Sequence, residues 1–412
     1  MKILQRISLL FFTVMIWFTI RQYLFCPQFS FAKGKPFSGN HFYNPYAGIG
    51  SGSWIKCNFH AHTNAWNGLT NGHGTAADVW RSYDSLGYTV HCVSDYQKIN
   101  SDFNTKINYL PAYEHGYNFK KTHELVLGDH KVTWLEYILP QSLSNKQWIL
   151  DNLAGNGNNL IALNHPAIRN GFNESDLIYL NKYDCIEVLN PYGSSISYWD
   201  AALSAGKPVF IMGNDDAHHV EKIASIGKDC TWVNIDALNC KSIVKALKTG
   251  RSYGMHIADV PCETEANRIK RLRDDLPRLK EFSVSHDTIQ MALSQKAVEI
   301  QFTGQKGKIL STTCQVSQAR YVIKSGDRYV RATIIFADGT EIFLSPVFRY
   351  SVSPFAETSG PVINRTKTIL YFLTGLLILS AWGLIVANSL FGNLVRRIRL
   401  AQKRRPAYPA VG

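Results

Sequence analysis

The sequence lacks the features of a disulfide-rich or zinc-ribbon scaffold. Its 412 residues include eight cysteines, but none form a Cys-x-x-Cys pair, which excludes the spacing of a zinc ribbon. Several cysteines lie in apolar, strand-like runs, where cysteine commonly serves as a small buried hydrophobe: Cys57, Cys92, Cys185 and Cys230. The sequence is compatible with a disulfide bridge between Cys230 and Cys240. Because 45% of the residues are hydrophobic and 18% charged, a disordered chain is also excluded.

The central part of the chain lacks a strong excess of positive charge. The formal net charge is +13, but eight of the 44 lysines and arginines flank the two terminal apolar stretches. That leaves 36 basic residues against 31 acidic ones in the remainder of the sequence. The excess therefore reflects membrane topology rather than a ligand surface, and we do not expect a nucleic-acid partner.

Charge is absent from the last apolar stretch. Residues 368–395 carry no charged side chain, and this length exceeds the roughly 20 residues that cross a bilayer. We expect a transmembrane helix over 367–395, preceded by a tether over 353–366 and followed by a basic cytoplasmic tail over 396–412. The bilayer is thus an expected partner.

A shorter apolar stretch near the N-terminus allows two interpretations. Residues 1–25 form either an uncleaved anchor, with Arg21 snorkelling to the interface, or a signal peptide cleaved near Ser30-Phe31-Ala32. In both cases basic flanks stay in the cytoplasm, so residues 26–365 face the periplasm or the exterior of a bacterial cell. We therefore place the chain in the bacterial cytoplasmic (inner) membrane.

The outward portion divides into three parts after a linker over 26–51. Residues 52–257 alternate short apolar strands with helical stretches, as in WIKCNFH followed by TAADVWRSYDSLG, which predicts an α/β domain with a mainly parallel sheet. Periodicity leaves a closed barrel and an open sheet as alternatives. Residues 258–282 read as a charged linker. Residues 283–352 alternate with period two, which predicts a small all-β, sandwich-like module.

Imidazoles and carboxylates recur at the ends of the expected strands of the α/β domain. The set comprises His60, His62, Asp95, Glu114, His123, His165, Glu187, Asp216 and His218. In parallel α/β folds the ligand site lies at the carboxyl ends of the strands, so we expect these side chains to converge. Buried ionisable groups need partners, and neutral imidazole with carboxylate suits zinc, manganese or iron. The sequence therefore predicts a divalent-metal site.

Most of these residues lie in five short motifs: HAHT at 60–63, SDY at 94–96, YEHG at 113–116, NHP at 164–166 and DDAH at 215–218. This pattern resembles the PHP family, named for polymerase and histidinol phosphatase, over roughly residues 54–256. The resemblance implies a distorted (β/α)7 barrel with a multi-metal phosphoesterase site. Within the family, the chain is most similar to membrane-linked bacterial envelope proteins.

The resemblance also implies how the side chains share the metals. One ion would be bound by His60, His62, Glu114 and Asp216, and a second by Glu114 as a bridge, His123 and His165. A third site in the family uses residues that are replaced here by Asn67 and Tyr96, which leaves His218 largely alone. We therefore expect two ions.

Two roles besides metal binding are predicted for these side chains. We expect Asp216 or Asp95 to orient the attacking hydroxide, and His218 to donate to the leaving oxygen or hold a phosphate; support of the metal ligands is the alternative.

These observations predict a membrane-anchored, outward-facing, metal-dependent hydrolase that acts on anionic, phosphorylated substrates. The alternative is a barrel that keeps its metal without turnover and serves as a binding or assembly component of an envelope complex. In that case the β module would contact protein partners. Hydrolysis of an amide or a cyclic ester on the same metals also stays open.

Overall fold

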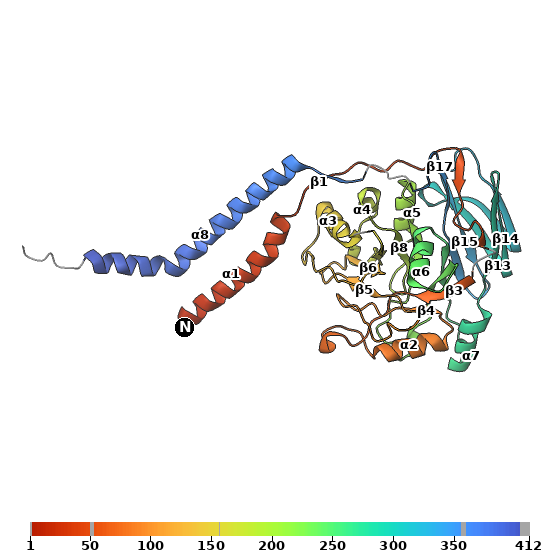
Figure 1. Ribbon diagram of the computed structural model, residues 1–412, viewed down its shortest axis with the longest axis horizontal. Helices are drawn as coiled ribbons and strands as arrows, with labels where there is room; N and C mark the ends of the chain where they lie inside the picture. Colours follow the sequence, from red (N-terminus) through yellow and green to blue (C-terminus); the bar gives the residue numbers. More distant parts are fainter. Residues whose placement is uncertain (1, 50–52, 156, 356–359, 404–412) are drawn as a thin grey trace, which may run out of the picture. The chain divides into compact units, whose positions relative to one another are not determined.

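The computed structural model describes residues 2–49, 53–155, 157–355 and 360–403, which form two units (Figure 1). One unit contains both ends of the chain, up to Ser30 and from Val362 onward. The other spans Phe31–Pro361. Part of the expected cytoplasmic tail, residues 404–412, lies outside the described residues.

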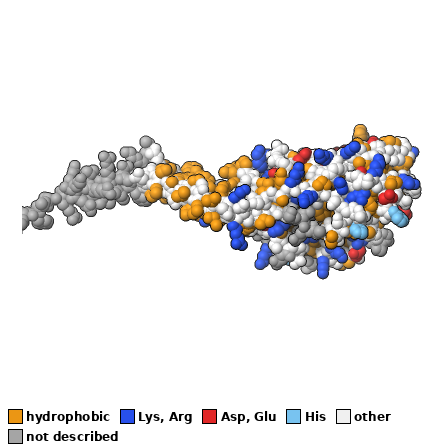
Figure 2. All heavy atoms as spheres, turned by 90° about the horizontal axis from the view of Figure 1, so that it is seen from above, with side chains coloured by type: hydrophobic (Ala, Val, Ile, Leu, Met, Phe, Trp, Pro, Cys, Tyr) orange, Lys and Arg blue, Asp and Glu red, His pale blue; other side chains and the backbone are white. Residues whose placement is uncertain are grey.

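The terminal unit is built from two long helices. Helix α1 (Lys2–Leu24) and helix α8 (Arg365–Lys403) each contain a segment long and apolar enough to cross a membrane, Ile7–Leu24 and Arg365–Ser389. Figure 2 shows hydrophobic side chains covering the visible helical part, whereas lysine and arginine side chains are scattered over the visible face of the other unit.

Strands β1 (Phe29–Ser30) and β18 (Val362–Ile363) adjoin these helices and pair antiparallel. The backbone N–H of Gln28 donates to Thr368 Oγ1 at 3.0 Å. A Cβ at Gly375 would lie 2.9 Å from Leu24 Cβ, so α8 approaches α1 closely at this glycine. The two ends of the chain therefore form one paired structure.

Two sheets form the centre of the Phe31–Pro361 unit. The first has five strands in the order β5 (Ala112–His115), β6 (His123–Leu127), β7 (Leu160–Asn164), β8 (Cys185–Leu189) and β9 (Phe210–Gly213). The main path of the second sheet runs β12 (Leu279–Ser285), β13 (Thr288–Gly304), β15 (Tyr329–Ile335), β16 (Glu341–Leu344), β11 (Ser252–His256), β10 (Asp229–Ile235), β3 (Ser53–Asn58) and β4 (Val90–His91). Three further strands join that sheet at its side: β14 (Lys308–Val322), β17 (Val347–Tyr350) and β2 (His41–Tyr43).

The fold is mixed α/β, as expected, but the strands do not close into the expected seven-stranded barrel. Within the described residues, only single bridges join the two sheets, Tyr96↔Glu114 and Ala61↔Ala217. The β5–β6 connection spans residues 116–122, which is too short for a helical crossover, so β6 runs antiparallel to both β5 and β7. Among the strands that the structure describes, only β3–β4 and β7–β8–β9 are parallel.

The expected α/β domain and β module share the second sheet. Strand β11 of the former pairs with β16 of the latter, with Tyr253 opposite Leu344 and Met255 opposite Ile342. The expected linker over 258–282 contains helix α7 (Glu265–Lys270) and the start of β12. The two predicted parts are thus continuous through backbone hydrogen bonds.

Several helices of this unit begin at a residue whose side chain caps the helix. Their bounds are α2 (Ala76–Ser85), α3 (Leu143–Ala154), α4 (Glu174–Tyr179), α5 (Ile196–Ser204) and α6 (Cys240–Lys248). Thr75 and Asp78 form a capping box at α2, as Ser142 and Asn145 do at α3. Buried residues on one face of each helix, such as Val79 on α2, then pack toward the sheets.

Candidate metal centre

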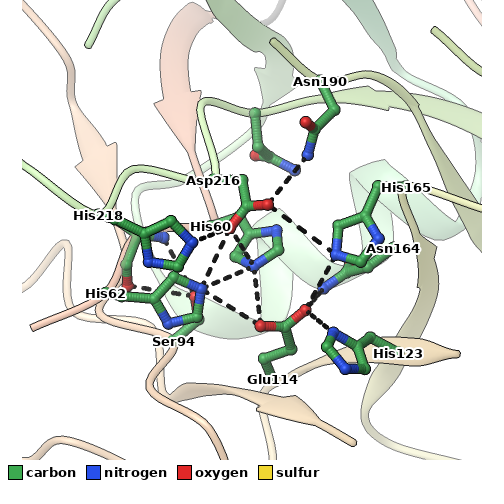
Figure 3. A network of polar contacts seen from close by, with 12 residues as sticks. His60, His62, Ser94, Glu114, His123, Asn164, His165, Asn190, Asp216 and His218 are labelled. Atoms are coloured by element: carbon green, nitrogen blue, oxygen red, sulfur yellow. Dashed lines mark hydrogen bonds and ion pairs between the residues drawn. The ribbon is translucent and has the colours of Figure 1, made fainter. Parts of the chain in front are cut away.

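The ligand-type side chains meet at one edge of the two sheets (Figure 3). His60 and His62 follow β3, Glu114 lies on β5 and His123 opens β6. Because β6 is antiparallel to β5, its first residue lies at the same edge as the end of β5. His165 and Asp216 follow β7 and β9 and have positive φ angles of 29° and 45°, which are uncommon for residues other than glycine.

The first group consists of His60, His62, Glu114 and Asp216, all buried. Nε2 of His60 lies 3.1 Å from Nε2 of His62 and 3.2 Å from both Glu114 Oε2 and Asp216 Oδ1. Nε2 of His62 lies 3.2 Å from the same two oxygens. Donor atoms about 2 Å from one zinc ion in a tetrahedral set lie roughly 3.3 Å apart, and these five separations are close to that value.

The second group shares Glu114 with the first. Its other oxygen, Oε1, lies 2.8 Å from His123 Nδ1 and 3.2 Å from His165 Nε2. Asn164 Nδ2 also donates to this oxygen at 3.1 Å. Glu114 is therefore placed to bridge the two groups, with one carboxylate oxygen in each (Figure 3).

Gly116 allows the second group to form. A Cβ at this position would lie 2.5 Å from His123 Cδ2, and its φ of 121° disfavours any residue with a side chain. The sequence alone assigned this glycine no role. Its place directly after the Glu-His pair of YEHG was the only available signal.

The electrostatics of both groups favour a positive charge at their centre. Burial alone would lower the pKa of His60, but nearby carboxylates, led by Asp216 and Glu114, raise it well above its ordinary value. Burial would raise the pKa of Glu114, but the imidazoles of His123 and His60 bring it well below its ordinary range. The carboxylates are therefore ionised and attract cations.

Glu187 fixes the orientation of the His60 ring through Nδ1, the ring nitrogen outside the first group. Its Oε1 lies 2.9 Å from His60 Nδ1, so the Nδ1 proton points at this carboxylate and the Nε2 lone pair faces the first group. Asn214 and Asn190 donate to the two oxygens of Glu187 at 3.0 and 3.1 Å. This agrees with a supporting place for Glu187 beneath the site rather than in either ligand group.

The residues present fit a divalent cation. With its proton on Nδ1, His60 turns a lone pair toward two carboxylate oxygens only 3.2 Å away, which is repulsive unless a proton or a cation lies between them. Glu114 Oε2 is buried and accepts no hydrogen bond from the described residues. Nitrogen and oxygen donors in this mixture suit zinc, manganese or iron.

The predicted catalytic residues lie in three different settings. Asp216 belongs to the first group. Asp95 is outside both groups, since its Oδ1 accepts from the backbone N–H of Thr63 at 2.7 Å and its Oδ2 from the Thr63 hydroxyl at 2.6 Å. Asp95 thus holds the loop after His62, and its predicted role with the attacking hydroxide stays a prediction.

His218 lies at the rim rather than within either group. Its ring stacks on His62 with centroids 4.6 Å apart, and its Nε2 is 3.5 Å from Asp216 Oδ1. The exposed fraction of its side chain is 13%, against 3% or less for the four grouped histidines. Burial lowers its pKa to about 4, so its imidazole is neutral at pH 7.

Tyr96 occupies the opposite face of His62. The two rings stack with centroids 4.6 Å apart, so His62 lies between His218 and Tyr96. Lys121 Nζ donates to Tyr96 Oη at 3.3 Å. Burial, and then the charges of Glu114 and Asp216, raise the pKa of Tyr96, which keeps the phenol protonated.

Comparisons with known proteins give two similar solved structures. One is a two-domain protein from Bacteroides vulgatus ATCC 8482 that contains a predicted PHP-like metal-dependent phosphoesterase, with 12% identity, 80% of this chain and 99% of that chain covered, and a TM-score of 0.39. The other is PsfC from Pseudomonas syringae PB-5123, with 13% identity, coverage of 54% and 97%, and a TM-score of 0.36. No family model and no curated protein match the chain.

Proposed function

We propose that this chain is a metal-dependent phosphoesterase that uses water to hydrolyse a phosphoester bond. The observation that carries the proposal is the convergence of two groups of buried ligand atoms on one shared carboxylate, that of Glu114. Paired divalent ions of this kind promote in-line displacement at phosphorus. The substrate is accordingly an anionic, phosphorylated molecule.

Each group would hold one ion of manganese, zinc or iron. The first ion would be held by His60, His62, Glu114 and Asp216, and the second by Glu114, His123 and His165. When bound, the ions supply a water of lowered pKa and positive charge for the phosphoryl oxygens. In the overall reaction the water oxygen bonds to phosphorus and the bond from phosphorus to the ester oxygen breaks. A proton from the water ends on the released alcohol.

The side chains around the groups orient the reactants. We assign Asp216 to orienting the attacking water, since its carboxylate belongs to the first group and can accept a hydrogen bond from a water held there. We assign His218 a hydrogen bond to the leaving oxygen, because its side chain, 13% exposed, is the most exposed imidazole beside the two groups.

We further propose that the terminal unit anchors the chain in the bacterial cytoplasmic membrane, with Phe31–Pro361 facing outward. Antiparallel pairing of β1 with β18 and the close approach at Gly375 support an α1 that is retained as an anchor, since a cleaved α1 would leave α8 without this partner. A reporter fused after Gly412 should be active on the cytoplasmic side. Activity on the periplasmic side would contradict this orientation.

A second candidate function is a metal-binding scaffold without turnover. Tyr96 and Asn67, where the resemblance expects metal ligands, favour it. Strand β14 pairs only with β13 in the part of the chain that the structure describes, so its other edge offers backbone groups to an envelope protein. This candidate predicts bound metal but no hydrolysis of any ester.

The test uses the purified full-length chain in detergent, loaded with manganese or zinc. It is assayed with an aryl phosphate and an aryl phosphodiester, and its metal content is measured by elemental analysis. Glu114→Gln should lower kcat/KM by at least about 100-fold and lower the metal content from two ions, because both groups lose their shared ligand. Glu221→Gln, an exposed carboxylate, is the matched control. Bound metal without turnover would favour the scaffold, and three ions per chain would contradict the two-ion site.

A further inference from the structure

Two exposed tryptophans lie together beside the metal centre. Trp66 and Trp134 expose 44% and 57% of their surface, and their rings meet edge to face with centroids 6.1 Å apart. We call this pair the tryptophan shelf. Large exposed aromatic side chains at the same place mark binding surfaces more often than scattered apolar residues do.

The shelf is joined to the metal ligands through Tyr96. The ring of Tyr96 stacks on the ligand His62, and the indole N–H of Trp66 donates to the Tyr96 backbone carbonyl at 2.8 Å. The shelf therefore begins next to a residue that touches the first group. A molecule whose reacting atom lies at the metals can reach the shelf along this side of the site.

The backbone is strained where it presents Trp66. Trp66 and Asn67 both have positive φ angles, 53° and 55°, which a bulky side chain rarely adopts. The loop is held at its base, because Thr63 donates twice to Asp95 and the Asn64 N–H donates to the Gly74 carbonyl at 2.8 Å. The surrounding structure thus fixes a conformation that the residue alone would not favour.

Trp134 is positioned by a separate buried network. His115 lies on β5 next to Glu114, with its Nδ1 2.7 Å from Glu124 Oε2. Its Nε2 donates to the backbone carbonyl of Leu135 at 2.8 Å. Leu135 directly follows Trp134 in the sequence. The strand that supplies the bridging carboxylate therefore also holds the segment that carries the second tryptophan.

A positive charge lies against Tyr96, the residue that touches both the ligand His62 and Trp66. Lys121 Nζ is 3.3 Å from Tyr96 Oη and 5.2 Å from the centroid of the Tyr96 ring, and the φ of Lys121 is also positive at 58°. An ammonium group at this position complements the negative oxygens of a phosphoryl group. The flat indole rings of the shelf complement a ring rather than a flexible chain.

We infer that the tryptophan shelf binds the alcohol portion of the substrate, and that this portion carries a flat ring next to the ester oxygen. This inference rests on the proposed phosphoesterase function and adds the substrate class to it. Lys121 binds the phosphoryl end of the same molecule. A protein or lipid contact at the shelf is the competing explanation, and it predicts no preference among small phosphoesters.

The test compares benzyl phosphate with propyl phosphate, whose alcohols are of similar basicity, so that only the ring differs. The full-length metal-loaded chain should prefer benzyl phosphate in kcat/KM by about tenfold. In Trp66→Leu and Trp134→Leu the ratio should fall toward one. Leu69→Ala changes an apolar side chain of the same loop that is 88% exposed, and it should keep the ratio. Equal kcat/KM for the two esters in the unchanged chain would overturn the inference.

A binding measurement separates failure of the inference from failure of the proposed function. Benzylphosphonate and propylphosphonate are not hydrolysed, so calorimetry with the metal-loaded chain detects the shelf even without turnover. Benzylphosphonate should bind about tenfold more tightly, and either tryptophan substitution should remove the difference. Preferential binding without hydrolysis of any ester would keep the shelf and reject the phosphoesterase. Equal binding of the two phosphonates would reject the shelf.

Discussion

At the scale of single residues, one buried carboxylate beneath the site controls how His60 presents its lone pair. Glu187 accepts the Nδ1 proton of His60, and carboxylates in this position raise the basicity of a ligating imidazole. Glu187→Gln should therefore weaken metal binding by about 10-fold to 100-fold, measured by competition with a chromophoric chelator. Glu221→Gln should bind metal as the unchanged chain does. An unchanged affinity in Glu187→Gln would show that His60 is oriented by other contacts.

A second residue, Lys56, makes the free energy of unfolding depend on pH in the alkaline range. Lys56 is 2% exposed and donates to the Leu86 and Leu272 carbonyls, and burial lowers its pKa from 10.5 to about 8. Between these values the unfolded chain holds a proton on Lys56 that the folded chain has lost, so the contribution of Lys56 to stability rises with pH from about 8 to 10.5. The gain from this residue is about 3 kcal/mol.

The measurement is urea unfolding between pH 7.5 and 10.5 for the unchanged chain and two variants. The free energy of unfolding of the unchanged chain minus that of Lys56→Met should rise over this range, because the variant has no ammonium group at this position. The same difference taken with Lys280→Met, which replaces an exposed lysine, should stay constant. An equal dependence on pH in Lys56→Met and the unchanged chain would contradict the role of Lys56.

The convergence of ligand-type side chains was the feature that the sequence indicated most closely. The two sets expected to hold one ion each are the sets whose atoms converge, because short motifs such as His60-Ala-His62 place imidazoles at strand ends whatever the strand order. Their binding of metal stays a prediction. The place of Asp95 against Thr63 was not foreseen. Its environment depends on a loop whose course no motif encodes.

At the scale of secondary-structure elements, the β5–β6 turn controls the second group. Gly116→Ala would bring a Cβ to 2.5 Å from the His123 ring and strain a φ of 121°, so the ring should move from its place beside Glu114. We expect the metal content of the chain to fall from two ions toward one, while the first group keeps its ion.

Gly157→Ala is the matched control for this change. Gly157 also has a positive φ, 75°, but a Cβ at this position would meet no atom of the described residues within 4 Å. The variant should lose some stability but no metal. Full occupancy of both ions in Gly116→Ala, measured by elemental analysis, would contradict the role of this turn.

An ion pair fastens helix α5 to strand β15. Arg331 Nε and Nη2 donate to Asp200 Oδ1 and Oδ2 at 2.9 and 2.7 Å, and both residues are buried. Asp200→Asn leaves the guanidinium without a counter-charge and should cost about 3–5 kcal/mol in urea unfolding. Asp236→Asn breaks the more exposed pair with Arg251 and should cost about 1 kcal/mol or less. Equal losses of unfolding free energy in Asp200→Asn and Asp236→Asn would show that burial does not determine how much each ion pair contributes.

Strand direction explains why the elements were foreseen less well than the residues. Alternating strands and helices predicted a mainly parallel sheet, but the 116–122 connection forces β6 antiparallel to β5, and β10 is antiparallel to both of its neighbours. Period-two alternation predicted strands over 283–352, and β13, β14, β15, β16 and β17 lie in this range. The alternation does not reveal that β16 pairs with β11, because these two strands are far apart in the sequence.

At the scale of the whole molecule, the sequence suggested separable domains where the structure has one continuous sheet. Residues 52–257 and 283–352 differ in periodicity, which is why they read as two parts. Their shared sheet and the pair Asp200–Arg331 connect them within the compact Phe31–Pro361 unit. The two units of the structure divide beside Ser30 and Val362.

The pairing of Ser30 with Val362 has a consequence for engineering the protein. Because the chain enters and leaves the Phe31–Pro361 unit at adjacent positions, a short peptide link could close that unit into a ring without either long helix. The cyclised form should stay in solution without detergent and unfold at a higher temperature than the same segment with open ends, since closure reduces the entropy of its unfolded state. Calorimetry of the two forms measures that difference, and equal melting temperatures would mean that the ends are not held together.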